Sequence, residues 1–183
     1  MDYFSQSFTN IVLSSGKYLR DDHIEHFFEL VKKIFHPYLY VTQLQLSDYI
    51  EFSLPSSRNN IHILYRTLTD NNLLSGGNWV CSYYDTKFIY IYVSLNEKIE
   101  SESYKLVLKK LYPYYFEKGK KIIWPTVQLQ QECDCGVFAI GFAVSLYFGF
   151  RPERVIYDNS NLTMRKFLLY LFKEQIIEHF PFK

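Results

Sequence analysis

The sequence lacks a large net charge, a disulfide framework and a long hydrophobic run, and each of these absences excludes a class of protein. Its 20 basic residues nearly balance its 19 acidic ones, so no overall charge attracts it to nucleic acid or to a membrane. Three cysteines are too few for a small disulfide-stapled secreted domain. The longest uncharged apolar run, residues 135–150, is too short to span a bilayer. The N-terminus has no signal-peptide pattern, so we expect a cytoplasmic or nuclear protein.

Alanine is also scarce, whereas aromatic residues are abundant. Alanine occurs only at positions 139 and 143, beside 17 tyrosines and 16 phenylalanines. Either an A/T-rich coding background or an aromatic binding surface explains this excess, and composition does not distinguish the two. With 48% hydrophobic residues in 183 positions, the chain is long enough for one domain, residues 1–183, with a sizeable core.

The order of the predicted elements is that of an α+β protein. A first helix is expected within residues 15–35, with Asp21 or Asp22 as its cap and Pro37 beyond its end. Residues 40–54 favour a strand followed by a loop. Further strands are predicted over residues 61–65, 78–84, 88–93 and 121–127. Further helices are predicted over residues 101–116 (breaking near Pro113), 135–149 (closed by Gly149) and 161–180.

Cys135 is the first candidate for chemistry, because it opens the charge-free helix. Unpaired N–H groups and the positive dipole end of a helix favour a thiolate, so its pKa is predicted to be lowered. The same N–H groups could hold an oxyanion. Glutamines at positions 128, 130 and 131 precede it, and a side-chain amide from this cluster could add a donor. A buried structural cysteine is the alternative reading of the pattern.

The segment "DCGVFAIGFA" (residues 134–143), preceded by the glutamines, resembles the nucleophile segment of the ubiquitin-like-protein-specific cysteine proteases. This family is called Ulp or sentrin-specific and is related to the adenovirus protease. Two further stretches resemble the family in the same order. They are "YLRDDHIEHFFELV" (18–31), with Tyr18 at the place of a tryptophan, and "GGNWVCSYYDTKFIYIYVSLN" (76–96). Residues 61–65 resemble the strand before the second stretch, so the resemblance covers residues 16–149.

The resemblance implies a papain-like fold, in which a central buried helix packs on a mixed β-sheet, and a Cys–His–Asp triad with Cys135 as the nucleophile. It also implies a ubiquitin-like protein of the SUMO type, or its conjugates, as partner, and no cofactor or metal. Trp79 would line the groove for the di-glycine tail. Gln130, or alternatively Gln128, would serve the oxyanion hole. The family's glutamine stands six positions before the cysteine, which is Leu129 here.

Two departures put the activity in doubt. The family's histidine position holds Asn78, and its aspartate position holds Val93. With Asp85 and Thr86 as a two-residue hairpin loop, paired residue numbers sum to 171, which places Asn78 directly opposite Val93. Asparagine is not a base near neutral pH, and valine cannot orient an imidazole. Loss of the base typically lowers the rate by about 10⁴ to 10⁶.

Other histidines and cysteines offer weaker candidates. His62 lies on the preceding strand and could approach the site as a substitute base. His23 and His26 share a helix face but lack a third metal ligand. His179 is expected to face water. Cys133 could form an oxidised pair with Cys135, and the basic residues 117–121 are expected to be a solvated loop.

Three hypotheses follow from the sequence. The chain is a Ulp-like cysteine peptidase by descent, impaired at two positions. Alternatively, it is a non-catalytic pseudoprotease that binds the tail of a ubiquitin-like protein. The third hypothesis is a decaying copy of a mobile-element or viral gene, without selected activity.

Overall fold

A four-stranded sheet and the helices around it form the computed structural model, which describes residues 4–34, 43–44, 60–67, 77–98, 102–113, 115 and 121–183. The strands lie in the order β1-β2-β3-β4. β1 pairs in parallel with β2, and the remaining pairs are antiparallel, so the sheet is mixed. The strands are β1 (Gln43–Leu44), β2 (Asn60–Thr67), β3 (Gly77–Tyr84) and β4 (Ile89–Tyr92). The last three confirm the predicted strands, while most of residues 40–54 lies outside the described residues.

The turn between β3 and β4 lies one residue later than predicted. The Asp85 amide donates to the Phe88 carbonyl over 3.2 Å, so the turn residues are Thr86 and Lys87. The Asp85 carboxylate accepts hydrogen bonds from the amides two and three residues later, Lys87 at 3.0 Å and Phe88 at 2.7 Å. An aspartate that closes a turn on its own backbone sets the turn position.

The register of this hairpin therefore differs from the predicted one. Cys81 lies opposite Tyr92 and Tyr84 opposite Ile89, so paired numbers sum to 173. Continuing this register places Val93 level with Val80, and the predicted pair of Asn78 with Val93 is wrong. Because the shift is two residues, both side chains still belong to the same face of the sheet.

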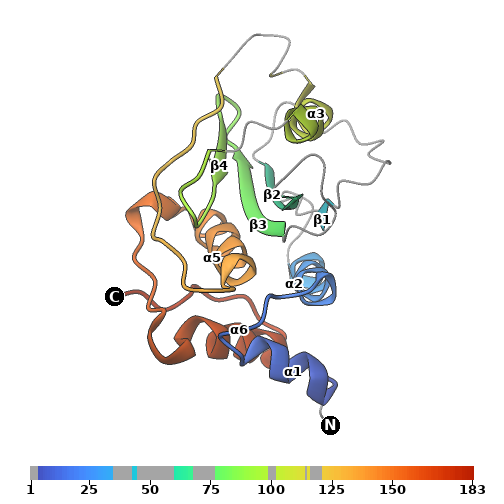
Figure 1. The fold of residues 1–183 in the computed structure, drawn as a ribbon, viewed down its shortest axis with the longest axis vertical. Helices are drawn as coiled ribbons and strands as arrows, with labels where there is room; N and C mark the ends of the chain where they lie inside the picture. The colour runs from blue at the N-terminus through green and yellow to red at the C-terminus, as the bar shows by residue number, and fades with distance from the viewer. Residues whose placement is uncertain are drawn as a thin grey trace.

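Each face of the sheet is covered by a different helix (Figure 1). Ile61, Ile63, Trp79 and Cys81 pack with α5 (Cys135–Tyr147) in the larger buried cluster. Side chains that point to the other face of the sheet pack with α3 (Glu102–Leu111) in the smaller buried cluster. They are Leu64, Val80, Tyr84, Ile89, Ile91 and Val93. Alternation along the strands thus separates the two faces.

Three more helices gather beyond the sheet (Figure 1). α2 (Asp21–Ile34) confirms the first predicted helix, with Asp21 and Asp22 in its first turn, whereas Pro37 lies outside the described residues. α1 (Gln6–Val12) was not predicted, and the Ser5 hydroxyl caps it by accepting from the Phe8 amide at 3.2 Å. α6 (Thr163–Glu174) contacts α1, α2 and α5. No helix in the described ranges has the length and apolar character needed to cross a membrane.

Two predictions near the C-terminal half are wrong in part. α6 ends at Glu174 instead of near 180, because Gln175 adopts a left-handed conformation. The chain beyond it pairs with residues 156–158, through Asp158 N to Pro181 O and Lys183 N to Ile156 O, both 2.8 Å. The strand expected over 121–127 is a single bridge between Ile123 and Tyr90. Short 3-10 turns, Pro152–Arg154 and Ser160–Leu162, connect α5 to α6.

Candidate functional site

Cys135 is the first residue of α5, as predicted, and only 1% of its surface is exposed. Every residue from Cys135 to Leu146 is buried, because a helix without charge on any side is stable only when surrounded by other elements. Gly136 allows close packing at this end. A Cβ atom there would lie 2.9 Å from Leu19 Cβ and 3.2 Å from Trp79 Cδ1. The thiol is thus held between α5, the segment before α2 and strand β3.

The predicted lowering of the Cys135 pKa is wrong. Burial raises the pKa of the thiol to about 11, although the backbone N–H groups of Trp79 and Gly136 act in the opposite direction. A helix dipole favours a charge at its N-terminus by about 0.3–1 kcal/mol, whereas burying a charge costs several kcal/mol. Cys135 is therefore a neutral thiol at pH 7.

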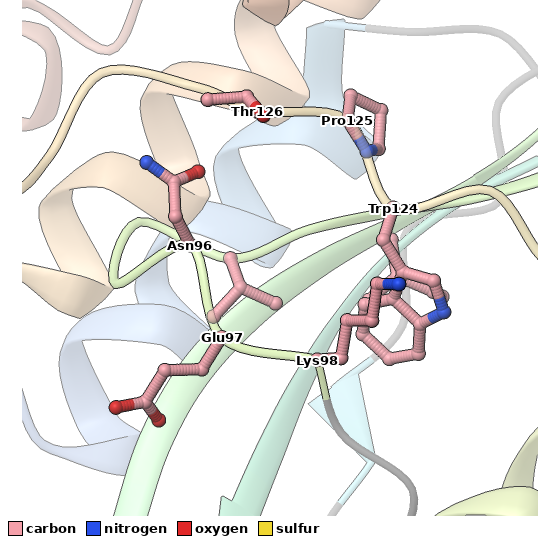
Figure 2. Close-up of a pocket in the computed structure, with 8 residues that line it drawn as sticks. Asn96, Glu97, Lys98, Trp124, Pro125 and Thr126 are labelled. Carbon is pink, nitrogen blue, oxygen red and sulfur yellow. The ribbon is translucent and has the colours of Figure 1, made fainter.

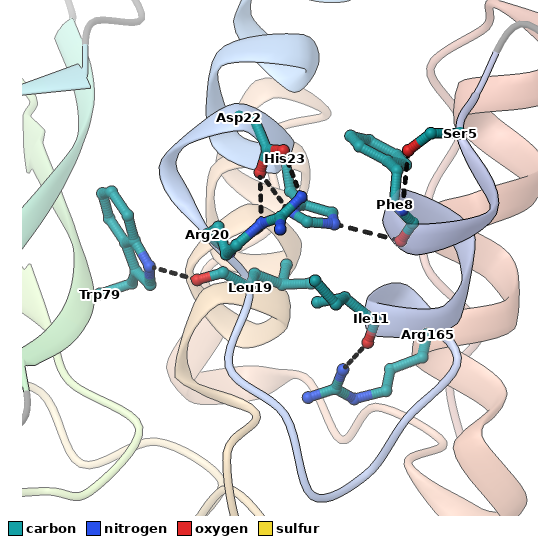
Figure 3. A network of polar contacts seen from close by, with 9 residues as sticks. All are labelled: Ser5, Phe8, Ile11, Leu19, Arg20, Asp22, His23, Trp79 and Arg165. Carbon is teal, nitrogen blue, oxygen red and sulfur yellow. Dashed lines mark hydrogen bonds and ion pairs between the residues drawn. The ribbon is translucent and has the colours of Figure 1, made fainter.

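Trp79 is fixed beside the thiol. Its indole Nε1 donates to the Leu19 carbonyl over 3.1 Å, and its side chain is 2% exposed (Figure 3). The Tyr65 ring packs against it with its edge, at a centroid distance of 4.9 Å. Tyr18, which precedes Leu19, is by contrast exposed over 57% of its surface. Its hydroxyl lies beside Cys133, which raises the pKa of Tyr18 by hydrogen bonding and by its charge.

Asn78 precedes Trp79 and is also buried, with 3% exposure. Its amide nitrogen has no hydrogen-bond partner within the described part of the chain. Such a donor destabilises the fold by about 1–3 kcal/mol relative to a satisfied one. Val93 is 2% exposed and lies two positions away from the place opposite Asn78. Both side chains belong to the α3 face.

Val93 also lines a small pocket of about 110 Å³ together with Asn96, Trp124 and Pro125 (Figure 2). Asn96 fixes one wall of it, because its amide group exchanges two hydrogen bonds with the Val127 backbone, at 2.8 and 2.9 Å. The pocket leaves room beside position 93 for a polar side chain and water.

The glutamines before Cys135 have different partners. Gln128 forms two hydrogen bonds with the Tyr157 backbone, at 3.1 and 2.7 Å, and holds that loop. The Gln130 carbonyl oxygen accepts from the Ser94 hydroxyl at 2.5 Å, and its backbone N–H donates to Ser94 O at 3.0 Å. Leu129 between them is 61% exposed. Gln130 is thus tied to the residue after Val93, which leaves its NH₂ group as a donor for another partner.

Arg165 is a residue of the site region that the sequence reading missed. It is 1% exposed, and its Nε donates to the Asp134 carboxylate over 2.6 Å, directly before Cys135. Nothing in the sequence marks it, because the adjacent Lys166 has the same charge and is exposed. Only tertiary packing distinguishes the two.

The described histidines lie away from the Cys135 thiol or have other partners. His62 lies on the α3 face, with its ring centroid 5.8 Å from that of Tyr112, and burial lowers its pKa to about 3. The suggestion that it could approach the site is wrong, because Cys135 packs on the opposite face. His179 is half-buried instead of solvated, with Nε2 3.1 Å from the Ser145 hydroxyl. His23 bonds the Phe8 carbonyl. No group of three potential metal ligands occurs among the described residues.

Neither a protein-family model nor a curated protein sequence matches this chain. Solved structures of Ulp1, described as a SUMO protease, are similar to it in fold. One, with the catalytic cysteine oxidized to a sulfenic acid, has a TM-score of 0.62 at 16% identity over 96% of this chain and 85% of that one. The C-terminal Ulp1 protease domain in complex with Smt3, the yeast ortholog of SUMO, has a TM-score of 0.59 at 17% identity over 91% and 81%. The chain therefore has a fold like that of the Ulp1 protease domain.

Proposed function

We propose that this chain is a Ulp-like cysteine peptidase domain by descent, with a papain-like arrangement, that turns over little or no substrate. The observation that carries the proposal is the state of Cys135. It occupies the start of the buried helix in a fold like that of Ulp1, yet its thiol is buried and neutral at pH 7. The positions that would supply base and acid hold Asn78 and Val93. Nothing at these positions can accept the thiol proton.

The alternative is a pseudoprotease that binds a ubiquitin-like tail without cleaving it. Trp79 favours it, because its indole is held by the Leu19 carbonyl beside Cys135, as a groove wall would be. Because the residue proposed to bind the tail and the position proposed for the base are different residues, the chain can lose catalysis and still bind the tail. The partner under both readings is a ubiquitin-like protein of the SUMO type, and Ulp1 in its complex with Smt3 provides the precedent.

The test uses a SUMO-type protein whose C-terminus carries an electrophile that reacts with thiols. We expect slow labelling of the wild type and none of Cys135→Ala. Because Asn78 and Val93 lie on the α3 face and do not face each other, the double change Asn78→His and Val93→Asp restores only the residue types, and we expect the labelling rate to stay low. The pocket beside Val93 gives the new carboxylate room. Rapid labelling of the wild type would contradict the loss of activity, and absence of labelling in both the wild type and the double variant would contradict the peptidase descent.

Titration with the unmodified SUMO-type protein tests the pseudoprotease. In a Trp124→Phe background, where Trp79 is the one remaining tryptophan, an unchanged fluorescence at high concentration contradicts it.

A further inference from the structure

Arg165 connects the loop before Cys135 to a distant part of the chain. Its Nε donates to Asp134 Oδ1 at 2.6 Å, and its Nη2 donates to the Cys133 carbonyl at 2.9 Å. Cys133 has a positive φ of 63°, a backbone conformation that costs about 1–2 kcal/mol for such a residue. The guanidinium thus fixes both residues that lead into α5.

The same guanidinium also holds the segment that leads to Tyr18. Nη1 donates to the Ile11 carbonyl at 3.1 Å, as Figure 3 shows, and to the Val12 carbonyl at 3.2 Å, both at the end of α1. Nη2 donates to the Lys17 carbonyl at 2.8 Å. An arginine has five N–H donors in a planar fork, and these contacts use all of them. A lysine could not reproduce this arrangement.

Tyr18 lies between two backbone carbonyls that are held by buried donors. The Lys17 carbonyl accepts from Arg165, and the Leu19 carbonyl accepts from the Trp79 indole at 3.1 Å. The Tyr18 main chain is therefore fixed on both sides, although its ring is 57% exposed. Its hydroxyl hydrogen-bonds the Cys133 side chain and lies near Cys135. The ring is thus presented at the surface beside the buried thiol.

We infer that Arg165 is a positioning residue that holds the Tyr18 segment against the Cys133–Cys135 loop and so keeps the Cys135 thiol covered. It acts through Tyr18 and the loop, and it need not touch a substrate. The inference rests on the proposed function, because the positioned surface is the one proposed to receive the tail. Its readout does not require that partner, since a small neutral thiol reagent reports access to Cys135 directly.

The experiment measures alkylation of each cysteine by iodoacetamide, followed by mass spectrometry, in the full chain. Cys81 is the internal reference, because it lies fully buried in β3 and responds only to opening of the core. In Tyr18→Ala and Arg165→Met, we expect the Cys135 rate to rise about tenfold relative to Cys81, as for a local opening. The double variant should match the larger single effect, because both changes release the same contact.

Three outcomes overturn the inference. If Cys81 and Cys135 accelerate in parallel in Arg165→Met, the arginine only stabilises the fold. If the two single effects multiply in the double variant, Arg165 does not act through Tyr18. If Arg165→Met fails to fold, Tyr18→Ala, which changes an exposed side chain, decides alone: an unchanged Cys135 rate refutes the role. Failure to bind a SUMO-type protein would refute the proposed function and leave these rates unaffected.

Discussion

Each end of helix α5 carries a side chain that could act as a nucleophile, but among the described residues only the one near its C-terminal end is hydrogen-bonded to a histidine. At its start, the Cys135 thiol lies beside backbone N–H groups, and Asn78 stands where the proposed function requires a base. Near its end, the Ser145 hydroxyl lies 3.1 Å from His179 Nε2, and His179 Nδ1 lies 2.8 Å from the Phe180 carbonyl. That spacing is the one expected of a nucleophile and its base. Ser145, however, is fully buried.

The contrast shows that hydrogen-bond distance alone does not identify a catalytic pair. The Ser145 hydroxyl also bonds the Tyr157 hydroxyl at 2.7 Å, which donates to the Gly141 carbonyl at 3.2 Å. These groups satisfy one another inside the core, so their role is to join the C-terminal segment to α5. At the other end, Arg165 and Asp134 satisfy one another in the same way. Each end of the helix is therefore held by a buried polar contact.

The largest expected effect concerns the contact at the start of the helix. Asp134→Ala leaves the buried Arg165 charge without its carboxylate, and we expect the free energy of unfolding to fall by about 3–5 kcal/mol. The measurement is urea denaturation followed by circular dichroism. Glu29→Ala is the matched control, since its pair with Lys32 at 2.7 Å has both side chains more than half exposed and should contribute little to the free energy of unfolding. Equal losses in both variants would contradict a special role for the buried pair.

A smaller effect is expected at the other end. Ser145→Ala removes the partner of both the Tyr157 hydroxyl and His179 Nε2, so the free energy of unfolding should fall by about 1–3 kcal/mol. Because this end is structural, labelling of Cys135 should not change. The same denaturation and labelling assays check both statements. Loss of labelling at unchanged stability would instead assign Ser145 and His179 a part in the site.

The third prediction concerns the histidine on the α3 face. Burial lowers the pKa of His62 from 6.5 to about 3, so below pH 6.5 the unfolded chain binds a proton that the folded chain does not. The corresponding stability is complete above pH 6.5 and is lost as the pH falls toward 3. Between pH 6.5 and 5 this amounts to about 2 kcal/mol.

His62→Phe should abolish this part of the pH dependence, measured as the urea midpoint at both pH values. The half-buried His26, whose pKa is also lowered by burial, is the comparison, and His26→Phe should change the slope less. An identical slope in wild type and His62→Phe would show that His62 is not the group concerned.

Much of the fold could be predicted from the sequence, because the relevant signals are local. The charge-free run after Cys135 predicts a buried helix, and alternating aromatic and β-branched residues predict β3 and β4. The hairpin register could not be predicted, since it depends on the Asp85 carboxylate closing the turn on Lys87 and Phe88. The end of α6 at Glu174 depends on a left-handed Gln175 that no sequence motif marks.

The candidate site was less predictable, because its properties arise from contacts between distant segments. The raised pKa of Cys135 depends on burial by parts of the chain far from it in sequence, including Leu19 and Trp79. Arg165 is separated from its acceptors by 31 to 154 positions. Local patterns can place a thiol at the start of a helix, but they do not report how much water reaches it.

Gly136 lets α5 approach Leu19 and Trp79 more closely than any residue with a side chain would. A Cβ atom there would push α5 and Trp79 apart by a few tenths of an ångström, because Leu19 and Trp79 already lie within 3.2 Å of its place. An alanine at this position would act as a wedge, admitting solvent to the thiol without altering any polar group. The access of solvent to the Cys135 thiol thus depends on the absence of one carbon atom at the next residue.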